Sequence, residues 1–247
     1  YPVMGTFQDF RIDNKEATYR RFEQYGHAKN ELIGYVVENI RRFKPKVVIG
    51  HDFAGEYGHG QHQVYAEVLS LAVELSMDKD QFPESAKTYG VWDVPKAYFH
   101  MYEENPIVMD WDQPLESLGG KTPFEVSIWG GFQMHKSQVP YFAWYYAGAD
   151  KASEIKKYNP CNFGLFRTTV GEDVAKNDFF ENLTTHAEDA IAEAKRKAEE
   201  EAARLAAEQE AQRKLEEEAA AREAARLAAE KTAAEKTAKT TNIRKTM

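Results

Sequence analysis

The chain has 247 residues, a formal net charge of −8 and a mean hydropathy of −0.65. This length allows one large domain or two small ones. The acidic balance argues against a basic nucleic-acid-binding surface, and no apolar run is long enough for a membrane span. The single cysteine, Cys161, excludes an internal disulfide framework.

The composition divides the chain into two parts. Every Trp, Tyr, Phe, Gly and Pro lies before position 187. We therefore predict a globular part over residues 1–186, long enough to bury a core, and a separate tail over residues 187–247.

The first clear elements are a helix and a strand between residues 30 and 52. Apolar residues recur at helical spacing at Leu32, Val36, Ile40 and Phe43, and Pro45 prevents the helix from continuing. The β-branched run over residues 47–49 is typical of a strand buried on both faces. In open α/β sheets, ligands bind beyond the carboxyl ends of the strands, where the segment from residue 50 to 62 lies.

Later segments favour an α/β fold. We predict a second helix after the glycines of residues 55–60, because the apolar residues there recur at helical spacing and form one stripe. We expect strands over residues 95–102 and 106–111, and a strand or short helix, helical near its end, over residues 124–138. Residues 163–183 read as a strand, a loop and a closing turn.

The tail is rich in Ala, Glu, Lys and Arg, and "AARLAAE" occurs at residues 202–208 and again at 224–230. Glu–Lys and Glu–Arg pairs four residues apart predict a helix. Large apolar residues are few, so a solvated spacer, a weak coiled coil that lets the chain self-associate and a partly disordered tail all stay open.

The segment "GHDFAGEYGHGQH" (residues 50–62) concentrates titratable side chains. His59 and His62 are three residues apart, so both can face one point, as zinc ligation or a ligand-plus-acid pair requires. Tyr57 is a candidate hydrogen-bond donor to developing charge. Asp52 and Glu56 are candidates to orient the histidines or to contact the metal. The alternative is a flexible polar loop with ordinary histidines.

Residues 51–62 resemble the second signature of the LmbE/PIG-L family of zinc-dependent N-deacetylases. The matching positions are His51, Asp52, Gly55, Tyr57, Gly58, His59 and His62, whereas Phe53 stands where proline is usual. The preceding residues 41–50 and the later segment His135–Gln138 are also similar. The resemblance implies a Rossmann-like parallel sheet layered with helices. It further implies zinc-dependent removal of the N-acetyl group from an N-acetylglucosamine-type sugar or glycoconjugate.

The resemblance also implies roles for individual residues. His62 would be a zinc ligand, and His59 would stabilise the oxyanion or protonate the leaving amine. Tyr57 would assist at the oxyanion. Gln61 takes the place of an aspartate that tunes the histidine. His135 would lie near the metal or sugar, although a surface helix histidine is an equal alternative.

One departure is large. The family's first signature, His-Pro-Asp-Asp-Glu, supplies two zinc ligands and the general base, and this sequence has no such run. We therefore expect that the N-terminal strands of the sheet are missing, and that this chain alone binds zinc weakly and is inactive. The residues that could substitute for the missing ligands are His27, His51, Asp52, Glu56 and His100, but none of them has the sequence context of the signature.

Two other functions stay open at this stage. The first is a non-catalytic carbohydrate-binding module with a structural helical tail. The second, a nucleotide-binding α/β domain, is weaker, because the "GKT" at residues 120–122 lacks the spacing of a phosphate-binding loop. The resemblance favours an exported or cell-surface protein, with a cytoplasmic one as the alternative.

Overall fold

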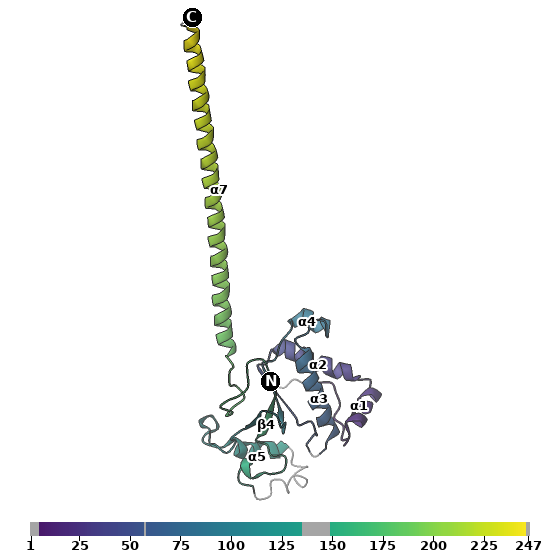
Figure 1. Cartoon of the computed structure of the whole chain (residues 1–247). Helices are drawn as coiled ribbons and strands as arrows, with labels where there is room; N and C mark the ends of the chain where they lie inside the picture. Colours follow the sequence, from purple (N-terminus) through teal and green to yellow (C-terminus); the bar gives the residue numbers. More distant parts are fainter. Residues whose placement is uncertain (1–4, 57, 135–148, 246–247) are drawn as a thin grey trace. The chain divides into compact units, whose positions relative to one another are not determined.

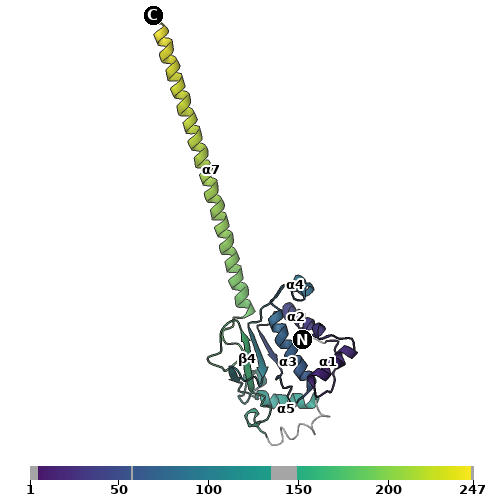
Figure 2. The same ribbon diagram turned by 45° about the vertical axis from the view of Figure 1, so that its right-hand side comes forward.

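The structure is a computed structural model that describes residues 5–56, 58–134 and 149–245 (Figures 1 and 2). The chain divides into two compact units, Tyr1–Leu183 and Thr184–Met247. Among the helices of the described residues, none combines the length and the apolar character needed to cross a bilayer.

The first unit contains a four-stranded sheet in the order β1-β2-β4-β3. Its strands are β1 (Val47–Gly50), β2 (Lys96–His100), β3 (Pro106–Val108) and β4 (Asn162–Thr168). Strand β1 pairs with β2 in parallel, whereas β4 is antiparallel to both β2 and β3. The α/β class is therefore confirmed, but the sheet is mixed, so the prediction of a Rossmann-like parallel sheet is not borne out.

The mixed topology arises from a short link and a glycine. Five residues, 101–105, join β2 to β3, too few for the helical crossover that usually connects neighbouring parallel strands. The link instead crosses over β4 at Gly164, where a Cβ atom would collide with the carbonyl oxygens of Tyr102 and Glu104. Strand β4, from much later in the chain, then fills the place between β2 and β3.

The two faces of the sheet belong to different cores. Alternate residues of a strand point to opposite faces, and neighbouring Ala97 and Tyr98 accordingly pack into separate clusters. Ala97 belongs to the larger core, which the N-terminal helices build with side chains such as Phe22 and Val64. Tyr98 packs against Phe179 at a ring-centroid distance of 4.8 Å.

The helices beside the sheet are α1 (Lys15–Gln24), α2 (Lys29–Phe43), α3 (Gly60–Leu75) and α4 (Pro83–Tyr89). Helices α2 and α3 confirm the two amphipathic helices predicted from the sequence. Helix α2 ends at Phe43, and the next residue, Lys44, has a left-handed φ of 48° directly before Pro45. Helix α3 packs against both α1 and α2, so it is held from two sides (Figures 1 and 2).

The sequence did not predict α1 or α4, although each carries a local start signal. The Asn14 side chain accepts a hydrogen bond from the Ala17 N–H and so caps α1. Pro83 stands in the first turn of α4. The segment over 124–138 is helical as far as described, in α5 (Pro123–Met134), and two short 3₁₀ turns lie at Glu116–Leu118 and Ala152–Glu154.

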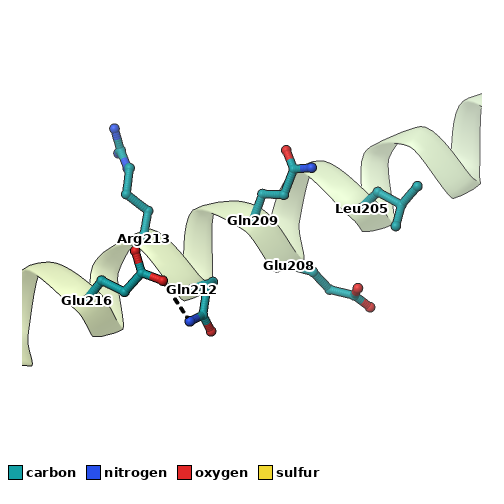
Figure 3. A pocket seen from close by; sticks show the side chains of 6 residues that line it. All are labelled: Leu205, Glu208, Gln209, Gln212, Arg213 and Glu216. Atoms are coloured by element: carbon teal, nitrogen blue, oxygen red, sulfur yellow. Dashed lines mark hydrogen bonds between the residues drawn. The ribbon is translucent and has the colours of Figure 1, made fainter.

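The second unit contains the helix α7 (His186–Lys245), of 60 residues, as the composition of the tail predicted. Side-chain pairs run along its surface, and Figure 3 shows one of them, Gln212 donating to Glu216 at 2.9 Å. All six side chains labelled in Figure 3 belong to this helix. Leu205, Leu215 and Leu227 are 47%, 62% and 54% exposed, so a coiled coil is not confirmed and self-association stays a prediction.

Candidate functional site

The candidate site lies at the carboxyl end of β1, where residues 51–59 lead into α3. Asp52 shapes this loop, because its carboxylate accepts hydrogen bonds from the Gly55 and Glu56 N–H groups at 2.9 and 2.8 Å. Gly55 has a φ of 80°, and a Cβ there would lie 2.5 Å from the His59 carbonyl oxygen. The backbone of Glu56 also has a left-handed φ, 42°. This conformation costs about 1–3 kcal/mol for a residue other than glycine.

Three side chains converge above this loop. His51, Glu56 and His62 each offer one ligand atom, and these atoms lie within 4.8 Å of one another. The rings of His51 and His62 stack at a centroid distance of 4.2 Å. The sequence assigned His62 to the metal, and the fold brings to it His51, from the start of the loop, and Glu56, from within the loop.

His59 is the residue before the first turn of α3, and its ring lies 4.5 Å from that of His62 between centroids. Its Nδ1 atom is buried and has no hydrogen-bond partner in the described part of the chain. A buried polar nitrogen without a partner is costly, so this atom is available to a group that enters the site.

The sequence named His100 only as a possible substitute ligand, but it is not in the group of three and hydrogen-bonds to Glu56 instead. It ends β2, and because β1 and β2 are parallel their carboxyl ends meet at one edge of the sheet. Its Nδ1 lies 2.8 Å from a carboxylate oxygen of Glu56, and its Nε2 lies 2.7 Å from the carbonyl oxygen of Asn159. The parallel pairing of β1 and β2 was a signal from which the contact of His100 with this loop could have been predicted. No signal in the sequence indicated the position of Asn159.

These contacts set the charges of the pair. Burial alone would raise the pKa of Glu56, but hydrogen bonds with His100 and His51 outweigh burial and hold that pKa well below its usual value. Burial would lower the pKa of His100, whereas the hydrogen bonds with Glu56 and the Asn159 backbone raise it. Both shifts favour the charged forms, a carboxylate hydrogen-bonded to an imidazolium.

The pKa of His62 is lowered, in contrast to the raised pKa of His100. Burial, followed by the charges of His51 and His59, lowers the pKa of His62, against the opposing effects of Glu56 and of a hydrogen bond with the Gly55 backbone. A lowered pKa favours the neutral imidazole, the form that binds metal ions.

Two of the predicted site residues, Gln61 and Asp52, are described but do not belong to the group of three. Gln61 is buried, accepts a hydrogen bond from the Phe10 N–H at 2.6 Å and donates to the Gln8 carbonyl oxygen at 3.0 Å. It thus anchors the segment before α1. Asp52 holds the turn and is not in the group of three. Tyr57 and His135 lie outside the described residues.

A cavity of about 480 Å³ adjoins the loop. Its aromatic walls come from Phe53, Tyr102 and Tyr158, and its carboxylates from Asp52, Glu103 and Glu104. A cavity of this size matches the range of small-molecule sites in proteins.

The donors of the loop fit a zinc ion. Two imidazoles and one carboxylate are a ligand set found in catalytic zinc sites. Zn–N and Zn–O distances near 2.1 Å place tetrahedral ligand atoms about 3.4 Å apart, which is closer than the 4.8 Å spread of the group. His51 can move to close this difference, because 43% of its side chain is exposed.

Comparisons with known proteins give partial matches, and no family model matches the chain. The chain is 30% identical over 95 residues to 1D-myo-inositol 2-acetamido-2-deoxy-alpha-D-glucopyranoside deacetylase 1 of Catenulispora acidiphila. This alignment covers 38% of this chain and 28% of the relative. It is 29% identical over 107 residues to mycothiol S-conjugate amidase of Streptomyces coelicolor, covering 42% and 36%.

A third relative is the 1D-myo-inositol 2-acetamido-2-deoxy-alpha-D-glucopyranoside deacetylase of Mycobacterium leprae, 33% identical over 81 residues, covering 30% of this chain and 25% of the relative. The matches thus span about a third or less of the length of these curated relatives. All three relatives are named as deacetylases or amidases, and the likeness to this chain is confined to these aligned stretches.

Proposed function

We propose that this chain carries part of the active centre of a zinc-dependent N-deacetylase that acts on an N-acetylated amino sugar or its conjugate. The observation that supports this most directly is the arrangement at the start of α3. His59 and His62 lie together at the carboxyl end of β1, beside an imidazole and a carboxylate whose ligand atoms lie within 4.8 Å of that of His62. The deacetylase and amidase names of the relatives agree with hydrolysis of an amide.

His62 would be a ligand of the zinc ion. When bound, zinc polarises an amide carbonyl and makes a bound water more acidic. The chain itself contributes a neutral imidazole, because burial lowers the pKa of His62, and the loop that Asp52 holds in place.

His59 would act on the substrate. Hydrolysis of an acetamide breaks the bond between carbonyl carbon and nitrogen; the hydroxyl of water goes to the carbon, and the nitrogen takes up a proton and leaves as an amine. The His59 ring lies beside that of His62, and its buried Nδ1 lacks a partner in the part of the chain that is described. We assign to it the proton for the leaving nitrogen, with Tyr57 as a donor to the oxyanion.

The cavity beside the loop would receive the sugar. Aromatic rings pack against the C–H faces of sugar rings, and carboxylates accept hydrogen bonds from hydroxyl groups. Phe53 and Tyr102 offer the first kind of contact, and Glu103 and Glu104 offer the second. This combination favours a neutral polyhydroxylated substrate.

The test compares ligands that differ only in the acetamide. In the presence of Zn²⁺, binding of methyl N-acetylglucosaminide and of methyl glucoside is measured by saturation-transfer NMR. We expect the acetamido sugar to bind more tightly, and the difference to be lost in His59→Ala but kept in the control His27→Ala. Equal binding of the two sugars would contradict the proposal, as would acetate release that survives both His62→Ala and chelation of zinc.

A further inference from the structure

We infer that His51, Glu56 and His62 together form a three-ligand zinc site inside this chain. The inference rests on the proposed function only for the role of His62, and it departs from the expectation that this chain alone binds zinc weakly. The sequence resemblance assigns the other two ligands to a signature that this sequence does not contain. The fold instead brings one imidazole and one carboxylate of the same loop to within 4.8 Å of the His62 ligand atom.

The loop is constrained to present Glu56. Asp52 holds the Glu56 N–H at 2.8 Å, and the residue keeps a left-handed φ of 42° that a flexible loop would relax. Local strain that persists under such restraint is commonly found at binding and active sites. Here the strained backbone directs the carboxylate toward His51 and His62.

The Glu56 side chain is held in turn by groups behind it. His100 bonds to the carboxylate at 2.8 Å and to the Asn159 carbonyl oxygen at 2.7 Å, so its ring is fixed at both nitrogens. Carboxylates that bind metals are typically oriented by such outer hydrogen bonds. The Glu56 side chain is 20% exposed and the His100 side chain only 10%. His100 therefore supports Glu56 from the more buried side.

The donor set selects the metal class. Imidazole nitrogen with a single carboxylate suits zinc and other late transition metals, whereas Ca²⁺ and Mg²⁺ prefer sites built from oxygen ligands. Three protein ligands leave one tetrahedral position for water or substrate, as in catalytic zinc sites. His51 is the solvent-facing member of the group, with 43% of its side chain exposed, so a metal ion could reach the group from solvent.

The experiment measures metal binding to the purified chain. Zn²⁺ is titrated calorimetrically into the wild type and the variants His51→Ala, Glu56→Gln and His62→Ala, and Co²⁺ is added to record the visible absorption of a tetrahedral site. We expect one equivalent in the wild type and an affinity at least about 100-fold lower in each variant, more than the loss of an outer hydrogen bond causes. His100→Leu, which removes such an outer bond, should weaken binding by about 10–100-fold.

A matched control is available elsewhere in the first unit. His27 and Glu31 form a histidine–carboxylate pair at 3.0 Å that does not belong to the group of three, so His27→Ala should bind Zn²⁺ as the wild type does. Tryptophan fluorescence checks that each variant is folded, and the exposed His51 is the substitution least able to disturb folding.

The outcomes separate this inference from the proposed function. If His62→Ala loses zinc while His51→Ala and Glu56→Gln retain it, the three-ligand site is wrong and His62 remains a ligand of a different set. If all four proteins bind zinc equally, or the wild type binds none, the three-ligand site is overturned as well. Binding of the acetamido sugar that still depends on His59 would then preserve the substrate assignment alone.

Discussion

Replacing His100 with leucine tests the support behind the loop. The substitution removes a hydrogen bond to a carboxylate, worth about 1.5–3 kcal/mol, and one to a neutral carbonyl, worth about 1 kcal/mol. Both partners are less than a third exposed, at 10% and 20% for His100 and Glu56, so solvent screens the interaction little. We expect the free energy of unfolding to fall by about 3 kcal/mol.

The loss should depend on pH in a defined window. Folding lowers the pKa of Glu56, so the contribution of the carboxylate is complete above its ordinary value of 4.5 and is lost as the pH falls toward the lowered pKa. Folding raises the pKa of His100, so the contribution of the imidazolium is complete below 6.5 and is lost as the pH rises through the raised pKa. The full difference is therefore expected near pH 5.5.

The assay is urea unfolding of metal-free protein followed by tryptophan fluorescence. All four tryptophans precede residue 184, so the signal reports the first unit and not α7. His100→Asn is an informative companion, because its amide can donate to Glu56 without reaching Asn159, and it should lose less stability than the leucine variant. A difference below about 1 kcal/mol at about pH 5.5, or one of equal size at about pH 9, would refute the reasoning.

Three further predictions concern the frame of the site and the tail. Arg41 is fully buried and donates hydrogen bonds to backbone carbonyl groups within residues 75–82. The substitution Arg41→Met should therefore lower the melting temperature by an amount that corresponds to about 3–5 kcal/mol. The control Arg42→Met, at an exposed position, should change the melting temperature little. In Gly60→Ala the new Cβ would lie 2.6 Å from the Asn14 carbonyl oxygen, so denaturant unfolding should show a loss of about 1–3 kcal/mol; no loss would show that α1 can move away from α3. A peptide of residues 184–247 should be helical by far-ultraviolet circular dichroism, and its helicity should fall as NaCl is raised, because pairs such as Arg196–Glu200 are exposed and screened by salt; helicity that is insensitive to salt would contradict a helix stabilised by ion pairs.

Elements with a strong local pattern could be predicted from the sequence. Helices α2 and α3 follow from the spacing of residues such as Leu32 and Val64, and α7 follows from composition and charge spacing. Strand β2 was expected from an aromatic-rich run. Helices α1 and α4 were missed because they are short and their start signals, Asn14 and Pro83, are weak without a strong apolar period.

Pairing between distant strands was beyond the sequence. Nothing local to residues 162–168 says that they insert between β2 and β3, or that the chain crosses β4 at Gly164. The pairing depends on long-range contacts, including those of the side chains that pack on the two faces of the sheet. The expected parallel sheet was therefore replaced by a mixed one.

The sequence by itself determined where the chemistry lies: a strand that ends at Gly50, a glycine-containing loop and a helix that carries His62 in its first turn. Helical spacing places His59 beside His62, because that contact is local. Only the tertiary structure decided which other side chains join them. Glu56 meets His100 because β1 and β2 run in parallel and end at the same edge of the sheet, 44 residues apart in sequence. Gln61, one position from His62, turns away to Gln8 and Phe10, because the packing of α1 against α3 brings that segment to it.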